Sequence, residues 1–352
     1  MRFVLIALVV CIPFTHAHAA EYIVPATVLE VRSERVEMLP GMQSTERVQE
    51  LEATLSDGAR VSITNDRIPL SVGDRFYALV SEDPAGRVVT VHDVDRIPVL
   101  IVAVVLFALA TIAVGAFIGL RALISLAISI AFILYGLVPL LGSGYPPLLV
   151  CGLGAAVILA LAMLVTHGVH SSVLAAYIAA IGAVLVAIGL GEVFVTAAHL
   201  TGYSDSAAAM VSVTIDGINM QGLLLGAIII GVLGIVDDLA ITQVATVAEL
   251  SASGVTSARE LYSRAMHVGR EHLGAVVNTL VLAYAGASLP LLMLFAYAPA
   301  PTLSLVNSEV IALEIVRAAI GGVALALVIP LATILAVYAQ RSGLTLEGKR
   351  HT

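Results

Sequence analysis

From Ile97 towards the C-terminus, long apolar runs alternate with short polar breaks. Each run, as an α-helix, is long enough to cross a hydrocarbon core about 30 Å thick. The pattern predicts seven membrane-spanning helices, at residues 97–118, 122–141, 147–166, 172–196, 219–237, 273–296 and 310–338. The predicted fold class is therefore an α-helical polytopic membrane protein, with a transmembrane helical bundle at residues 98–340 and a tail at residues 341–352.

Residues 21–97 carry a different pattern, in which apolar and polar side chains alternate over short stretches bounded by turn residues. Such alternation predicts antiparallel strands, here at residues 28–31, 50–55, 60–64, 75–80 and 87–91. Pro40-Gly41 and Pro84-Ala85-Gly86 are turn signals, and Asp57-Gly58 is typical of a hairpin turn. We predict a small antiparallel β-rich domain, a barrel or a sandwich, before the bundle.

The first 20 residues have the pattern of an export signal. Arg2 precedes an apolar run from Phe3 to Phe14, and Ala17-His18-Ala19 matches a small-residue cleavage pattern. Because the run is short for a membrane span, we predict a signal peptide at residues 1–20, with an uncleaved first helix as the alternative.

Composition agrees with a membrane protein: 59% of residues are hydrophobic, 12% are charged, and the mean hydropathy is +1.03. The predicted partner is therefore the lipid bilayer. Residues 21–96 contain 14 acidic residues and 8 arginines, a net charge of −6. With no basic patch in this domain, we expect no nucleic-acid partner.

Lysine and arginine are unevenly distributed among the breaks. The breaks at residues 142–146, 197–218 and 297–309 contain none, whereas the alternate breaks and the tail contain Arg121, Arg259, Arg264, Arg270, Arg341, Lys349 and Arg350. Basic loops face the cytoplasm. The C-terminus is therefore predicted to be cytoplasmic and the β-rich domain extracytoplasmic, in agreement with the export signal.

Adjacent carboxylates mark a candidate site. Asp237 and Asp238 end the fifth predicted span, and carboxylates in a bilayer are costly unless they are paired, hydrated or neutralised. Asp238, Thr242, Ala245 and Glu249 follow at helical spacing and share one face. Since residues 238–250 are too few to cross the membrane, we predict a break at 237–257 that holds a re-entrant or interfacial helix. In the alternative interpretation, the two aspartates lie among the lipid headgroups and cap this helix.

The next helix is predicted to start at a capping box, Ser257 to Glu260, with Glu260 and Arg264 four residues apart. His267, Glu271, Gly274 and Asn278 then form a polar stripe, although a buried Asn278 amide often bonds a neighbouring helix. Carboxylates attract cations and histidine titrates near neutral pH. The candidate ion or substrate path therefore comprises Asp237, Asp238, Thr242, Glu249, His267, Glu271 and Asn278.

Polar residues outside this path give weaker evidence for a functional site. Glu314 and Arg317 are spaced for a local ion pair. His167 and His170 flank Gly168 in a short loop, and two histidines without a third ligand do not complete a metal site.

Motifs for catalysis are missing from the sequence. It has no His-Glu-x-x-His or Gly-x-Ser-x-Gly motif. Asp237 and Asp238 are neighbours whose side chains point about 100° apart on a helix, unlike the facing carboxylates of an aspartyl protease. We therefore expect no enzyme, no catalytic residue and no cofactor.

Several segments together resemble a known family. They are Gly231-Val-Leu-Gly-Ile-Val-Asp-Asp238, Ile241-Thr-Gln-Val-Ala245, Ala258-Arg-Glu-Leu261, Gly269-Arg-Glu-His272 and the run from Val276 to Leu292. In these segments the chain resembles the YibE/F-like family of bacterial multipass membrane proteins. The resemblance implies a location in the bacterial inner membrane and an extracytoplasmic β-rich segment before the spans, but it assigns no ligand residues.

Two functions remain open. The first is a secondary transporter or channel for a cation or small solute, with a carboxylate-lined site near Asp237 and Asp238. The second is a non-transporting scaffold whose β-rich domain binds an envelope protein. The expected protein partner is such an envelope protein or a further copy of the chain in a homo-oligomer. A transporter built from inverted repeats should contain two matching broken helices. The sequence shows one candidate break, at 237–257, which favours the scaffold.

Overall fold

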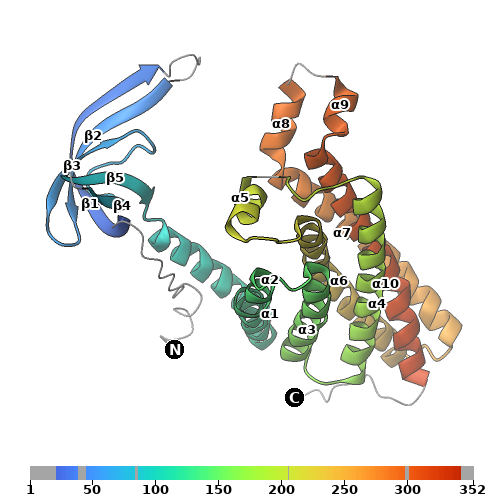
Figure 1. The fold of residues 1–352 in the computed structure, drawn as a ribbon. Coiled ribbons are helices and arrows are strands. Elements are labelled where there is room, and N and C mark those ends of the chain that lie inside the picture. Colours follow the sequence, from blue (N-terminus) through green and yellow to red (C-terminus); the bar gives the residue numbers. More distant parts are fainter. Residues whose placement is uncertain (1–20, 39–44, 84–85, 205, 298–300, 342–352) are drawn as a thin grey trace. The chain divides into compact units, whose positions relative to one another are not determined.

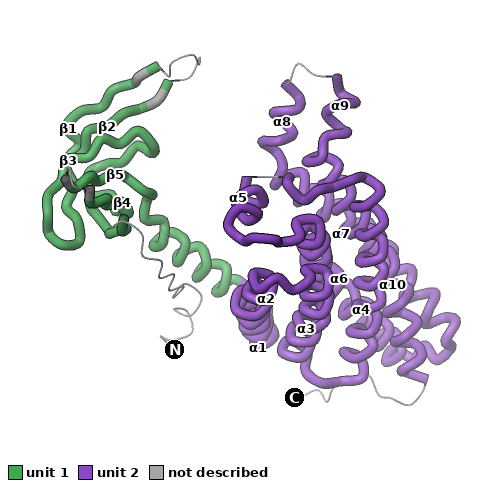
Figure 2. Tube along the Cα trace, in the orientation of Figure 1, with its two compact units in different colours: residues 1–110 green, residues 111–352 purple. Residues whose placement is uncertain are grey.

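A computed structural model describes residues 21–38, 45–83, 86–204, 206–297 and 301–341. The predicted signal peptide, Pro40-Gly41, Pro84-Ala85 and all of the tail after Arg341 lie outside these residues. The chain divides into two compact units, residues 1–110 and 111–352 (Figure 2). Each unit is described by itself.

The first unit contains an antiparallel sheet of five strands, each of which overlaps a predicted strand (Figure 1). The sheet order is β3-β2-β1-β4-β5, and β3 also contacts β5, so that the sheet curves into a half-barrel. Irregularities in the pairing of β1 with β2, near Val28 and Val31, bend the long first strand. The strands are β1 Glu21–Met38, β2 Thr45–Leu55, β3 Arg60–Asn65, β4 Arg75–Asp83 and β5 Gly86–Val94.

The sheet has its own hydrophobic core, which includes Val28, Leu51 and Phe76. Polar groups close the barrel beside it: the buried Gln49 amide accepts a hydrogen bond from the Leu70 amide (2.8 Å) and donates one to the Leu70 carbonyl (3.1 Å). The turn between β2 and β3 is at Asp57-Gly58, as predicted. Gly58 there has a φ of +82°, which glycine adopts without strain.

The second unit is helical, and α1 enters it from the first. The helices are α1 Ile97–Phe132, α2 Val138–Gly142, α3 Pro147–His167, α4 Ser171–Ala197, α5 Ser206–Thr214, α6 Met220–Ala252, α7 Ala258–Ala287, α8 Leu289–Tyr297, α9 Thr302–Val306 and α10 Glu309–Arg341, with a π-helical turn at Ile133–Leu137 between α1 and α2. In Figure 1, α3, α4, α6 and α10 run beside one another. Among them α6 contacts α3, α4, α7 and α10, which makes it the central helix.

The α1 helix contains a sharp turn. Ala116 has a φ of 46° and a ψ of −127°, far from helical values. A Cβ atom at Gly119 would collide with the carbonyl oxygen of Thr111. In a straight helix these two residues would be about 12 Å apart. The chain therefore turns back close to the boundary between the first two predicted spans.

Five helical stretches of the described residues are long and apolar enough to cross a membrane, Ile97–Gly142, Pro147–His167, Ser171–Ala197, Met220–Ala252 and Glu309–Arg341. A sixth results if α7 and α8, bent by 67°, count as one span. This confirms a helical membrane protein. The number seven stays a prediction, although the first stretch, 46 residues long, covers two predicted spans.

The predicted break at 237–257 is wrong. The α6 helix runs without interruption from Met220 to Ala252, with Asp237 and Asp238 near its middle. The aspartates therefore do not cap a following helix. Aspartate has only a weak preference against helix interiors. It is outweighed here by the burial of Val236, Leu239 and Ala240 on either side.

Polar side chains connect α10 to the rest of the second unit at two levels. At one, the buried Gln243 amide of α6 donates to the Ala265 carbonyl of α7 (2.9 Å) and to Thr333 Oγ1 of α10 (2.8 Å). At the other, the Glu309 carboxylate accepts hydrogen bonds from the backbone amides of Thr201 (2.7 Å) and Gly202 (3.0 Å). These bonds connect α10 to α6, to α7 and to the loop after α4.

Candidate functional site

Asp237 occupies an unusual environment in α6. Its side chain is partly buried, and its Oδ1 atom is enclosed without a hydrogen-bond partner among the described residues. An enclosed, unpartnered carboxylate oxygen is costly in a protein interior. Most native buried polar groups have a partner, which can be an ordered water or an ion. Asp237 is therefore the most informative polar group of the helix.

The predicted α6 stripe is a real feature of the structure. Asp238 and Glu249 are exposed, and Thr242 between them is half-buried. Gly231 and Gly234 extend this open face by two further turns. The rest of α6 is largely buried against its neighbours. The central helix thus has one accessible side, lined by small and polar residues.

The α7 stripe also lies on an accessible face, since His267, Glu271 and Asn278 are all exposed. Burial of Asn278 is therefore not observed. The helix starts at Ala258 with Ser257 as its N-terminal cap position, as predicted, but the Ser257 side chain makes no capping hydrogen bond.

Two predicted ion pairs are present. Glu260 and Arg264 pair on the surface of α7 at 2.6 Å. Glu314 and Arg317 pair on α10 at 2.7 Å, with each side chain about three-quarters covered.

The two stripes remain separate features of two contacting helices. Among the described residues, no hydrogen bond or ion pair joins Asp237, Asp238, Thr242 or Glu249 to the polar residues of the α7 stripe. The two helices approach one another near Gly231, where an added Cβ atom would lie 3.7 Å from the Tyr284 hydroxyl.

His167, which the sequence does not assign to the candidate path, lies near the carboxylates. The charges of Asp238 on α6 and Arg121 on α1 both act on the imidazole of His167, the last residue of α3. This proximity depends on how α1, α3 and α6 align. Because the three residues are far apart in the chain, the sequence does not predict it. In the described part of the chain, no three His, Cys, Asp or Glu side chains are grouped as metal ligands.

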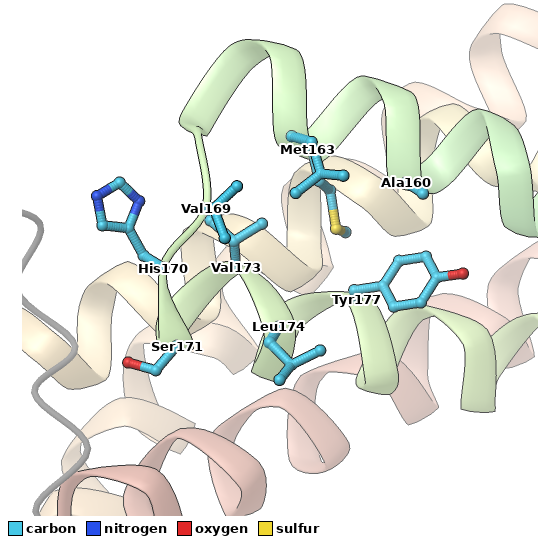
Figure 3. Close-up of a pocket in the computed structure, with 9 residues that line it drawn as sticks. Ala160, Met163, Val169, His170, Ser171, Val173, Leu174 and Tyr177 are labelled. Carbon is cyan, nitrogen blue, oxygen red and sulfur yellow. The ribbon is translucent and has the colours of Figure 1, made fainter.

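An open apolar hollow of about 470 Å³ lies between the adjoining ends of α3 and α4. Met163, Val173 and Tyr177 line it, and Figure 3 shows the His170 ring at its edge, directed away from Met163 and Tyr177. The Tyr177 hydroxyl donates to the Ala156 carbonyl of α3 (3.2 Å). The hollow is therefore apolar and carries none of the predicted site residues.

A family model described as "YibE/F-like protein" matches residues 103–342, which cover most of the helical unit and both polar stripes. The chain belongs to the YibE/F-like family. The resemblance found in the α6 and α7 segments is thereby confirmed. Comparisons of this YibE/F-like protein with curated proteins and with solved structures gave no match.

Proposed function

We propose that this YibE/F-like protein is a secondary transporter or channel for a cation or small solute, with Asp237 and Asp238 as its ion-binding carboxylates. The observation that supports this most is the enclosed, unpartnered Oδ1 of Asp237 near the middle of a continuous apolar helix. Ionisable residues inside membrane helices are rare and usually line paths for ions or substrates.

The surroundings of Asp238 support the same role. Asp238 lies on the accessible side of α6, and Gly234, one turn before it, has no neighbouring atom within 4 Å of an added Cβ. Free space beside a carboxylate leaves room for water or for a partly hydrated cation. Glu249, about three turns further along the same face, extends the polar route towards the end predicted to be cytoplasmic.

We assign the α7 stripe to the same route. His267, Glu271 and Asn278 lie on one accessible face, with Gly274 between them. The α7 helix contacts α6 directly. Polar faces on two contacting helices are expected to turn to water or to protein, because exposing them to lipid tails is costly.

Ion flux in proteoliposomes tests the proposal. Purified protein is reconstituted with an internal dye for H⁺, Na⁺ or K⁺, and flux is started with a gradient of that ion. Asp237→Asn and Asp238→Asn should each abolish flux while leaving expression and thermal stability nearly unchanged. Glu260→Gln is the matched control, because it removes a carboxylate of a surface ion pair, and it should retain full flux.

Two results would contradict the proposal. Full flux in both asparagine variants would refute the carboxylate site, even if the protein is a transporter. A wild-type protein that passes none of the three ions would favour the second candidate, a membrane scaffold whose β-rich unit binds an envelope partner. The self-contained core of that unit and its exposed Val36 and Met38 side chains favour this alternative.

A further inference from the structure

The alignment of α3 with α6 brings His167 to within about one turn of the carboxylates. Close contacts fix this alignment: an added Cβ at Gly222 would lie 3.3 Å from Pro147 Cδ, and one at Gly226 would lie 2.5 Å from Cys151 Sγ. Both contacts have the same offset along the chain, so the helices are parallel. Continuing the offset for four turns places His167 level with Thr242, about one turn from Asp238.

Arg121 approaches the same point from α1. Ser125, one turn after Arg121, donates a hydrogen bond to the Ala162 carbonyl of α3 (3.4 Å). The guanidinium of Arg121 lies 5.3 Å from the centre of the Phe117 ring, a cation–π distance that restrains it. Three helices thus bring one permanent cation, one titratable imidazole and one carboxylate into electrostatic range.

We propose that His167 is the proton-sensitive partner of Asp238 and controls the access of a monovalent cation to this carboxylate. The inference rests on the proposed function. A protonated imidazole attracts the Asp238 carboxylate and competes with a cation for it. When His167 releases its proton to the adjoining water, the carboxylate becomes free to bind the cation.

The exchange balances in charge, because one proton leaves as one monovalent cation binds. No bond other than the N–H bond of the imidazole is broken. Arg121 keeps its charge at every relevant pH, so it takes no part in the exchange. The charged groups that act on His167 among the described residues are Arg121 of α1 and Asp238 of α6. Asp237 adjoins Asp238 on the same helix.

The placement is tested first, independently of transport. In a full-length variant without native cysteines, His167→Cys is combined with Asp238→Cys and treated with a short bifunctional thiosulfonate. The control pairs His167→Cys with Glu249→Cys, which lies on the same face of α6 but about two turns from the level of His167, in the direction away from Asp238. The first pair should be cross-linked and the second should not. Absence of cross-linking in the first pair would refute the inference.

The role is tested by the pH dependence of Na⁺ and K⁺ flux in proteoliposomes. Wild-type flux should rise on the order of tenfold from pH 5.5 to 7.5, the range in which an imidazole titrates. In His167→Gln, the rates at the two pH values should agree within about twofold, because the competing charge is absent. His170→Gln, which changes a histidine at the edge of the hollow, should keep the wild-type profile.

The outcomes separate the role of His167 from the proposed carboxylate site. A wild-type pH profile in His167→Gln would refute the role of His167 while leaving the carboxylate site intact, provided that Asp238→Asn abolishes flux. Flux of neither ion in the wild type would refute both, and the cross-link would then report placement alone. A flat profile in His170→Gln as well would assign the pH dependence to the loop as a whole, and would also refute the inference.

Discussion

Replacing Gly269 with alanine should destabilise the helical unit, although alanine is the better helix former. Gly269 faces the point where α6, α7 and α10 meet. A Cβ atom there would lie 2.6 Å from Ile329 Cγ2 and 2.8 Å from Gln243 Oε1. Carbon atoms in contact are about 3.5–4.0 Å apart, so the neighbours would have to move by about 1 Å. Ile329 is 2% exposed and the Gln243 amide is held by two hydrogen bonds, so neither has room to do so.

The magnitude follows from three contributions. Overpacking costs about 1–3 kcal/mol. Displacing Gln243 weakens two interhelical hydrogen bonds, each worth about 0.6 kcal/mol in a membrane protein. Alanine returns about 1 kcal/mol of helix propensity. We expect Gly269→Ala to lower the free energy of unfolding by about 1–3 kcal/mol.

Gly274→Ala in the same helix is the matched control, because an added Cβ there has no atom within 4 Å. It should be neutral or stabilising by up to about 1 kcal/mol. Thermal unfolding in detergent, followed by the helical circular dichroism signal, should show the two variants about 5–10 °C apart. Equal melting temperatures would refute the close packing around Gly269.

Four further predictions concern other parts of the chain. A cysteine introduced at Ser204 should react with an impermeant reagent in spheroplasts and one at Ser257 should not; the opposite pattern would overturn the predicted orientation. The secreted fragment 21–97 should fold as a monomer with a β-type circular dichroism signal, and its absence would show that the core needs the helices. Hydrogen bonds from the Ala59 amide and from Arg87 lower the pKa of Asp57. The ionised carboxyl therefore stabilises the folded fragment above about pH 4, and this contribution is lost as the pH falls through the lowered pKa. Acid unfolding of Asp57→Asn should therefore be less steep, and an unchanged acid transition would contradict this. Glu309→Ala should lower the free energy of unfolding by about 1–3 kcal/mol through loss of charge-assisted hydrogen bonds. Glu309→Gln should lower it less, and equal losses in the two variants would show that the charge is unimportant.

Local patterns predicted much of the fold. The five strands and the Asp57-Gly58 turn follow from the alternation of apolar and polar residues and from turn residues. The start of α7 follows from the capping-box pattern at Ser257 to Glu260. The Glu314–Arg317 pair follows from helical spacing alone. These features depend on interactions between near neighbours in the chain, which the sequence displays directly.

The sequence does not predict the features that depend on tertiary packing. The break predicted after Asp237 and Asp238 rests on the cost of charge in lipid, but burial of the flanking apolar residues keeps α6 helical through them. The approach of His167 to Asp238 depends on glycine contacts that align α3 with α6. Gly222 and Gly226 are spaced four residues apart, as in many helix-packing motifs, yet the partner helix and the offset are properties of the folded chain.

The two sets of polar contacts that hold α10 have a mechanical consequence. Bonds at Glu309 near one end and at Thr333 nearer the other make α10, α6 and the loop after α4 a single stiff frame. The α3 helix lies against α6 of this frame through the close contacts at Gly222 and Gly226, and it is bonded to α4 through Tyr177. A slide of α3 by one turn, about 5.4 Å, would carry His167 from the level of Thr242 to that of Asp238, or by the same distance away from it. The axial position of α3 against α6, which the close contacts at Gly222 and Gly226 set, therefore decides how far the imidazole of His167 lies from the carboxylate of Asp238.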